Sequence, residues 1–293
     1  MTQENEDNLQ FLRFIELKSI DSTNNYALDM AKMQNLTERQ VDKLHGTSVF
    51  AHEQHQGKGQ RGKSWTSAPG ENVQTSLIIA PAPLKLHQQF VLSAMIALIV
   101  REVMSQKSGE EFTIKWPNDI YFQDRKAGGI LIENIVSGTD WRWAIAGIGL
   151  NINQTEFDPH LPNPVSLKEI TGKSYDCVAL AKEIGRKAFG AFEEFFPNGN
   201  VAPIRFADRR RHDEIAGETS SLVFFDGTET KEISRIILAE YNNHLYKRGE
   251  KVKLRKDSRV FEATIKEVTA SGQLVVEHAL EERFNFGEVV WLF

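Results

Sequence analysis

Residues 57–65 read Gly-Lys-Gly-Gln-Arg-Gly-Lys-Ser-Trp, a segment in which three glycines are interleaved with three cations. Glycine lets the backbone approach a ligand closely, and the cationic side chains add positive charge and N–H donors at the same place. We therefore expect this segment, called here the glycine loop, to bind a phosphorylated or carboxylated ligand. A flexible basic loop that binds nothing is the plainer alternative.

Residues 57–64 also match the Walker A pattern G-x-x-x-x-G-K-[ST] of P-loop nucleotide hydrolases. A P-loop requires a helix directly after the pattern, with its N-terminus facing the phosphates. Here the chain continues through Thr66 to Pro69-Gly70, which is typical of a turn. The sequence therefore disfavours a P-loop hydrolase, and the glycine loop is expected to join two strands.

Four further clusters place polar or small residues together, and each also has a purely structural interpretation. They are Asp21-Ser22-Thr23-Asn24, Lys115-Trp116-Pro117-Asn118-Asp119, the segment 124–130 and the segment 146–153. The first is typical of a helix cap, and the second fits a type I turn between strands. The third fits a charged hairpin tip, and the fourth fits close strand packing. A ligand held by backbone N–H groups and polar side chains is the alternative for all four.

Composition limits the function classes. The chain has 293 residues, 41% hydrophobic and 26% charged, with a net charge of −5, which disfavours a broad nucleic-acid surface. Cys177 is the only cysteine, so an internal disulfide and a cysteine-rich zinc site are excluded, and a cytoplasmic location is expected. The acidic N-terminal residues do not resemble a signal peptide. The apolar stretch 90–100 is expected to be a buried helix, with no membrane segment. The histidines lack metal-ligand spacing, and the serine-hydrolase elbow G-x-S-x-G is missing.

Hydrophobic periodicity predicts an α+β fold. Helices are expected from about Ser22, over 86–105 and over 177–196, and a fourth over 232–247. Strands are expected at 47–51, 74–80, 112–115, 120–122, 129–136 and 141–148, and again at 251–255, 260–268, 274–277 and 289–292. The last four strands predict a small β barrel. We expect a domain of residues 1–240, with a tail at 1–10 and an insertion or linker at 197–230, and a second domain of residues 241–293.

The glycine loop and the clusters, in this order, resemble the biotin protein ligases. That family carries a GRGR-type loop, a KWPND turn, a K-x-x-G-I-L-x-E segment and a G-x-N strand. The corresponding segments here are 54–65, 115–119, 126–133 and 149–151. The resemblance implies a catalytic domain related to class II aminoacyl-tRNA synthetases, with a mixed sheet and helices, followed by an SH3-like barrel. It also implies the reaction: biotin and ATP, with Mg²⁺, give biotinyl-5′-AMP and pyrophosphate, and biotin then passes to a lysine of a biotin carboxyl carrier domain.

The resemblance also implies roles for individual residues. Catalysis would involve Lys126, Lys58, Asp119 and Lys115. Biotin would be bound by Ser22, Thr23, Asn24, Gln54, Gly57, Lys58, Lys126 and Gly129. ATP and the adenylate would be bound by Lys58, Gln60, Arg61, Lys63, Trp65, Asn118, Lys126 and Asn151, and Mg²⁺ by Asp119. Folding of the glycine loop over the adenylate would keep water from a reactive mixed anhydride.

Two departures from the family pattern matter. Lys58 and Gln60 stand where the family loop usually has arginines, which weakens the expected grip on the adenylate. The motifs begin at Ser22, so we expect no N-terminal winged helix and no DNA binding. A lipoate protein ligase and a biotin or adenylate sensor without catalysis are the alternatives. The sequence leaves open the oligomeric state, a homodimer included, and the identity of the acceptor.

Overall fold

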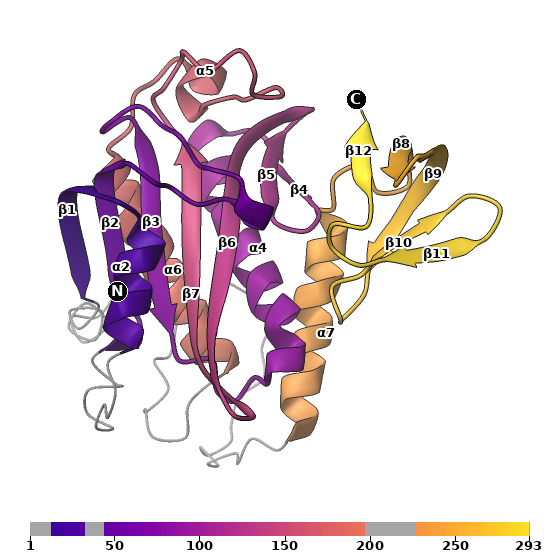
Figure 1. The fold of residues 1–293 in the computed structure, drawn as a ribbon, viewed down its shortest axis with the longest axis horizontal. Coiled ribbons are helices and arrows are strands. Elements are labelled where there is room, and N and C mark those ends of the chain that lie inside the picture. The colour runs from indigo at the N-terminus through magenta and orange to yellow at the C-terminus, as the bar shows by residue number, and fades with distance from the viewer. Residues whose placement is uncertain (1–12, 33–43, 197–226, 293) are drawn as a thin grey trace, which may run out of the picture.

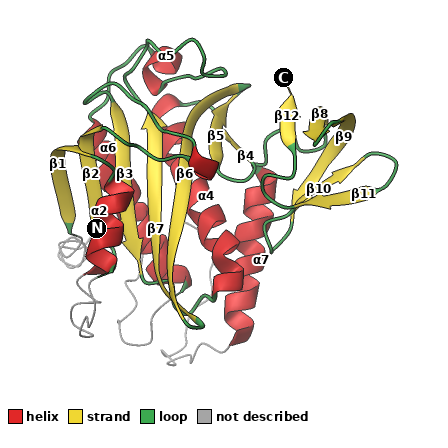
Figure 2. Ribbon diagram, in the orientation of Figure 1, coloured by secondary structure: helices red, strands yellow, loops and turns green. Residues whose placement is uncertain are grey.

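A computed structural model describes residues 13–32, 44–196 and 227–292. The expected N-terminal tail and residues 197–226 of the expected insertion lie outside this part of the chain. Two sheets organise the described residues (Figure 1). Helices cover the larger sheet, and the smaller sheet lies at one end of the molecule (Figure 2).

The larger sheet has seven strands in the order β1-β2-β3-β7-β6-β5-β4. Its strands are β1 (Phe14–Ile20), β2 (Ser48–Gln54), β3 (Asn72–Ile79), β4 (Thr113–Lys115), β5 (Asp119–Phe122), β6 (Arg125–Ser137) and β7 (Asp140–Asn151). The β1 and β2 strands pair in parallel, whereas every other neighbouring pair is antiparallel. The sheet is therefore mixed, and its centre is formed by the long hairpin of β6 and β7.

Helices pack on both faces of this sheet, which accordingly has two cores. On one face, α2 (Thr23–Ala31) covers a small core that includes Val49, Ile78 and Trp143. On the other face, α4 (Gln89–Ser108) and α6 (Cys177–Phe195) cover the main core. The short helices η2 (Gln60–Gly62), η3 (Leu86–Gln88) and α5 (Leu167–Thr171) lie in connections. Because both faces are covered, β3 is buried along its whole length.

The segment Leu86–Ser108 is the one described helical stretch that is long and apolar enough to cross a membrane. Its apolar side chains are instead packed in the main core, where Met95, Ile96 and Val100 are among its fully or almost fully buried residues. This agrees with the buried helix that the sequence predicted.

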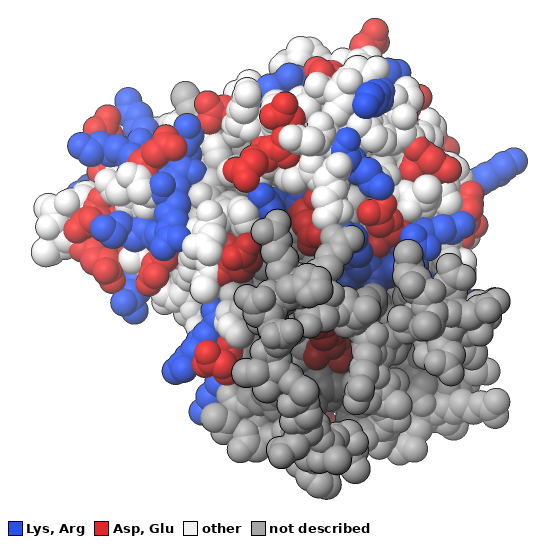
Figure 3. Space-filling view, turned by 180° about the vertical axis from the view of Figure 1, so that it is seen from behind, with Lys and Arg blue, Asp and Glu red and all other residues white. Residues whose placement is uncertain are grey.

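The second sheet is antiparallel, with the order β11-β10-β9-β8-β12. Its strands are β8 (Lys251–Lys256), β9 (Arg259–Val268), β10 (Leu274–Glu277), β11 (Glu281–Phe284) and β12 (Val290–Leu292). Cationic and anionic side chains are interspersed over this end of the molecule (Figure 3). Its inner residues, such as Leu254 and Leu274, belong to the same hydrophobic cluster as the main core. The second sheet is thus packed against the main core by apolar contacts.

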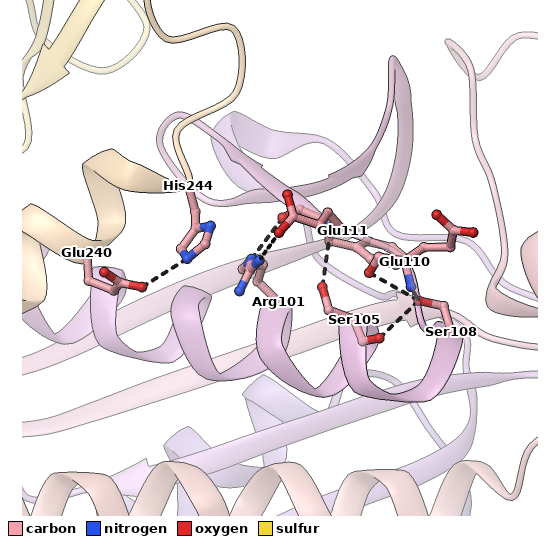
Figure 4. Close-up of polar contacts among 8 residues, drawn as sticks. Arg101, Ser105, Ser108, Glu110, Glu111, Glu240 and His244 are labelled. Atoms are coloured by element: carbon pink, nitrogen blue, oxygen red, sulfur yellow. Dashed lines mark hydrogen bonds and ion pairs between the residues drawn. The ribbon is translucent and has the colours of Figure 1, made fainter. Parts of the chain in front are cut away.

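The helix α7 (Gly227–Asn243) lies beside α4 and leads into the second sheet. Polar contacts fix this connection (Figure 4). Glu240, on the last turn of α7, accepts from His244, the first residue after the helix, at 2.9 Å. Nearby, the Nε of Arg101 on α4 donates to the carbonyl of Phe112 at 2.8 Å. The carbonyl of His244 then accepts from Ile114 N–H at 2.8 Å, which ties the connection to β4. The second sheet is therefore anchored next to the turn of residues 115–119, called here the Lys115 turn.

Most predicted elements are confirmed, although their bounds shift by a few residues. The loop after Ser64 leads into extended chain and a turn rather than a helix, which confirms the case against a P-loop. The sequence analysis missed β1, β11 and α5. Ser22 occupies the predicted N-cap position of α2, although its side chain makes no capping hydrogen bond. The Trp116-Pro117 bond is cis, which defines a type VI turn rather than type I.

Candidate functional site

A strip without side chains crosses the centre of the larger sheet on the face that carries α2. Gly149 of β7 pairs with Gly129 of β6, and the same row continues to Gln74 on β3 and Asp119 on β5. Two adjacent glycines leave the backbone exposed to anything that lies on this face. The strip therefore forms a floor, bounded by a neutral polar residue on one side and a carboxylate on the other.

The next row of the floor contains Gly147, which pairs with Ser76 and Leu131. A Cβ at Gly147 would lie 2.3 Å from Oδ1 of Asn24, so only glycine admits this side chain. Asn24 lies on α2, and its Nδ2 donates to Glu133 at 2.7 Å. The close approach of α2 to the sheet therefore depends on a small residue at this position.

Neutral hydrogen-bonding groups converge at the start of α2. Oε1 of Gln54 accepts from the Thr23 N–H at 2.7 Å and lies 3.1 Å from the Thr23 hydroxyl. Nε2 of Gln54 donates to Gln74 at 2.8 Å, and the hydroxyl of Ser76 lies 2.8 Å from that of Thr23. Ser22, Thr23 and Asn24 are all nearly inaccessible to solvent. Such a preorganised cluster suits a neutral ligand with both donors and acceptors.

A cation stands at the other side of the floor. Nζ of Lys126 lies 2.7 Å from Oδ1 of Asp119, and both side chains are about one-third exposed. A Cβ at Gly129 would lie 3.1 Å from Oδ1 of Asp119 and 3.4 Å from Nζ of Lys126. The ion pair thus lies directly over the glycine strip, where the lysine can meet an anionic ligand.

The glycine loop folds back on itself as a short ladder. Trp65 N–H donates to the Gly57 carbonyl at 2.8 Å, and Gly59 N–H donates to the Lys63 carbonyl at 2.6 Å. A Cβ at Gly57 would lie 2.3 Å from the Trp65 carbonyl oxygen, so the fold of the loop requires glycine there. This ladder delivers the Trp65 ring onto Gly149, where a Cβ would lie 2.6 Å from the ring. Within the described chain, Nε1 of Trp65 is buried without a hydrogen-bond partner.

Lys58 is the loop cation that reaches the floor. Its Nζ lies 3.3 Å from Oε1 of Glu133, the carboxylate that also accepts from Asn24. Lys58 is therefore connected to the start of α2 through Glu133. Most residues of the glycine loop, including Arg61, are exposed to solvent.

Asn118 and Asn151 are buried and hold backbone in place. Nδ2 of Asn118 donates to the Ile130 carbonyl, and Nδ2 of Asn151 donates to the carbonyls of Lys126 and Val165 at 3.3 and 3.2 Å. Both amides therefore fix β6 where it carries Lys126 and Gly129. Their amide nitrogens are directed at the protein backbone in this structure.

Lys115 is placed differently from the other expected catalytic residues. Its Nζ donates to the Tyr121 hydroxyl at 3.2 Å and lies 5.3 Å from the ring centroid of Trp291, in the second sheet. Burial lowers the pKa of Lys115 from 10.5 to about 8, while the charge of Asp119 acts in the opposite direction. Lys115 therefore lies in an aromatic setting between the two sheets, within electrostatic reach of Asp119.

Replacement of Lys115 by methionine should change the pH dependence of stability. The folded protein releases the Lys115 proton near pH 8, whereas the unfolded chain keeps it to about pH 10.5. The unfolded state binds more protons between these values, so the free energy of unfolding should rise with pH there. We expect wild type to gain about 1–3 kcal/mol relative to Lys115→Met between pH 8 and 10.5. Urea unfolding at several pH values measures this, and parallel curves for the two proteins would contradict it.

The structure thus brings most of the predicted site residues to one face of the sheet. Arg61 instead reaches the second sheet, where its Nη1 donates to the Gly287 carbonyl at 3.0 Å. For the side chains of Gln60 and Lys63, no hydrogen bond is found among the described residues. Gln74 and Ser76 were not predicted as site residues, whereas Gly147 and Glu133 lie in the predicted segments 146–153 and 126–133 but were given no individual role. Polar residues inside the otherwise apolar strand 72–79 were the signal for the first two.

Comparison with known proteins identifies the family. The model of the biotin/lipoate A/B protein ligase family matches residues 17–151. The biotin–[acetyl-CoA-carboxylase] ligase of Paracoccus denitrificans is 30% identical over 198 residues, which cover 65% of this chain and 77% of that protein. The chain belongs to the biotin/lipoate A/B protein ligase family. Another relative, the bifunctional ligase/repressor BirA of Escherichia coli K12, is 31% identical over 191 residues, covering 64% of this chain and 55% of BirA. The chain thus spans about half the length of that relative.

Solved structures of this family share the fold. The biotin protein ligase of Aquifex aeolicus in complex with biotin and ATP superimposes with a TM-score of 0.68 at 22% identity, covering 96% of this chain and 98% of that one. The Leishmania major biotin protein ligase in complex with biotinyl-5-AMP gives 0.57 at 21% identity, covering 93% and 98%. The likeness extends over both sheets, so the mixed α+β architecture expected from the sequence is confirmed.

Proposed function

We propose that the chain is an ATP-dependent biotin protein ligase. The observation that carries this proposal is the floor of Gly149 and Gly129, with the neutral cluster around Thr23 and Gln54 on one side and Lys126 on the other. A ureido ring requires paired neutral donors and acceptors, and the carboxylate requires a cation. The valeryl chain between them requires an apolar surface, which the backbone of Gly129 and the Trp65 ring over Gly149 offer. Biotin contains these three parts in the corresponding order. Family membership and the shared fold support the assignment.

The proposed ligand contacts are those that the sequence motifs imply, and the geometry supports some of them more than others. Ser22, Thr23, Asn24 and Gln54 bind the ureido ring, Gly57 and Lys58 lie beside it, and Lys126 and Gly129 hold the carboxylate end. Trp65, Asn118 and Asn151 bind the adenine part, and Gln60, Arg61 and Lys63 the phosphates. Support is strongest for Trp65, because an unpartnered buried N–H is costly unless a ligand accepts from it. Support is indirect for Asn118 and Asn151, whose amides hold β6.

The proposed reaction joins two anions. A biotin carboxylate oxygen attacks the α-phosphorus of ATP, the bond from that phosphorus to the bridging oxygen breaks, and pyrophosphate leaves. Lys126 reduces the repulsion between the reactants and stabilises negative charge that develops in the transition state. The amine of an acceptor lysine then attacks the carbonyl carbon of the mixed anhydride, and AMP leaves. Lys115 acts from behind the site, since Tyr121 and Trp291 surround its ammonium.

Asp119 is the proposed contact for Mg²⁺. A magnesium ion that arrives with a nucleotide needs only one or two protein carboxylates, because phosphates and water supply its other ligands. Within the described chain, there is no group of three or more metal-ligating side chains, so a dedicated protein cage for a metal is not formed. One carboxylate at the end of the floor fits a nucleotide-bound ion, which would add positive charge at the phosphates.

We also propose how the chain divides into two domains and which protein accepts biotin. The first unit, residues 1–240, binds biotin and ATP with a fold related to class II aminoacyl-tRNA synthetases, and residues 241–293 form an SH3-like barrel. The five short antiparallel strands of the second sheet support the barrel. The acceptor is a biotin carboxyl carrier domain.

The function is tested by offering the protein ATP, Mg²⁺ and a purified biotin carboxyl carrier domain, with biotin and lipoate in parallel reactions. We expect mass spectrometry to find biotin on one carrier lysine and no lipoyl product. A lipoyl product would support the lipoate ligase, which the breadth of the matched family keeps open. A bound ligand without any transfer would support the sensor.

A further inference from the structure

The turn formed by residues 285–288, in the second sheet, contacts two segments of the proposed site. These are the glycine loop and the Lys115 turn. Gly287 accepts a hydrogen bond from Arg61 in the glycine loop. Phe286 packs edge-on against Trp116 of the Lys115 turn, with ring centroids 5.9 Å apart. Nε1 of Trp116 also donates to the Gly272 carbonyl at 2.9 Å. The second sheet therefore reaches the site through these turns.

The turn itself is rigidly built. Glu288 N–H donates to the Asn285 carbonyl at 3.1 Å, and the Glu288 carboxylate accepts from the Asn285 N–H at 2.7 Å. Gly287 has a φ of +87°, as the third residue of a type II turn requires. The Gly287 carbonyl is thus held in a fixed direction, toward the glycine loop.

Arg61 is held in an unfavourable backbone conformation. Its φ of 56° and ψ of 41° lie in the left-handed region, which non-glycine residues rarely adopt. Such a conformation persists where surrounding contacts impose it. In the described chain, the hydrogen bond to Gly287 is the side-chain contact found for Arg61. This contact joins the tip of the loop to a domain more than 200 residues away in the sequence.

We propose that Arg61 is a positioning residue whose contact with Gly287 lets the second domain hold the glycine loop over the adenylate. This role rests on the proposed function and adds to it a specific task for the second domain. When the contact is made, the loop stays folded and the adenylate is retained until an acceptor arrives. When it is lost, the loop opens more often and the adenylate escapes.

The matched substitutions Gly287→Ala and Gly249→Ala test this contact. Both glycines lie in the second domain and have similar positive φ angles, 87° and 78°, so both substitutions impose similar backbone strain. A Cβ at Gly287 would lie 2.6 Å from Nη1 of Arg61, whereas a Cβ at Gly249 has no atom within 4 Å among the described residues. The difference between the two variants therefore isolates the contact with Arg61.

The first measurement is limited trypsin cleavage without substrates, followed by mass spectrometry. Lys58, Arg61 and Lys63 remain as cleavage sites in both variants. We expect cleavage within the loop to be about fivefold faster in Gly287→Ala than in Gly249→Ala, while both variants unfold at similar temperatures. Equal loop cleavage in the two variants would overturn the proposal. In the Gly287→Ala background, Arg61→Ala should add no further cleavage after Lys58 or Lys63.

The second measurement is biotin-dependent pyrophosphate release without an acceptor. Wild type should release about one equivalent and then slow, whereas Gly287→Ala should continue at a steady rate because the adenylate leaves. A general loss of structure would lower the rate, so an increase identifies loop opening. If wild type itself shows no biotin-dependent release, the proposed function fails, while the cleavage difference still tests the contact.

Discussion

The variant Lys126→Ala is expected to lose biotin-dependent pyrophosphate release by about 10²–10³-fold, the usual effect of removing one preorganised group from the transition state. Lys126 lies over Gly129, 2.7 Å from Asp119, at the place where the carboxylate of biotin would meet the α-phosphate. Its loss would leave the repulsion between the two anions unrelieved and Asp119 unpaired. Initial rates of pyrophosphate release at saturating biotin and ATP give the comparison.

Lys266→Ala is the matched control for this variant. Lys266 also forms an ion pair at 2.7 Å, with Glu277, but on the exposed surface of the second sheet. The control should retain the wild-type rate, because exposed ion pairs contribute little to stability and this one is remote from the floor. A Lys126→Ala variant as active as Lys266→Ala would show that the catalytic cation is elsewhere.

The variant Gly149→Ala is expected to raise the KM for ATP by about ten- to a hundredfold. A Cβ there would lie 2.6 Å from the Trp65 ring, so the ring must leave the sheet. Overpacking of this kind typically costs about 1–3 kcal/mol, which corresponds to this range of affinity if Trp65 binds the nucleotide. Initial rates over a series of ATP concentrations measure the change.

Gly185→Ala serves as its control, because a Cβ at this position of α6 would also lie 2.6 Å from a neighbouring side chain, that of Ser48. This clash lies between α6 and β2, away from the nucleotide. The control should lower the melting temperature without changing the KM for ATP. If the KM rises equally in both variants, Trp65 has no specific part in ATP binding.

Sequence periodicity could predict the central strands and long helices because each long element buries a continuous apolar face. The strand Phe14–Ile20 was missed, since it lies at the edge of the sheet, where its residues are only partly buried or exposed and do not alternate regularly. The short strand Glu281–Phe284 carries three charged residues and was missed for a similar reason. Local composition did not distinguish such segments from loops.

The site was predictable as a set of residues but not as an arrangement. The motifs pointed to Lys126 and Gly129, but strand register alone places Gly129 beside Gly149. Likewise, the contact of Arg61 with Gly287 depends on how the second sheet docks, which no local pattern encodes. The aromatic surroundings of Lys115 include Trp291 from that sheet, so its low pKa could not be anticipated.

The most direct test of the central claim is isotope exchange between pyrophosphate and ATP. Labelled pyrophosphate enters ATP only if an enzyme forms an adenylate reversibly, whereas simple ATP hydrolysis leaves ATP unlabelled. With the purified protein, Mg²⁺ and no acceptor, we expect exchange that requires biotin, is not supported by lipoate and is abolished in Lys126→Ala. Exchange that is absent with biotin, or independent of it, would contradict the account of the glycine floor as the place where biotin is activated.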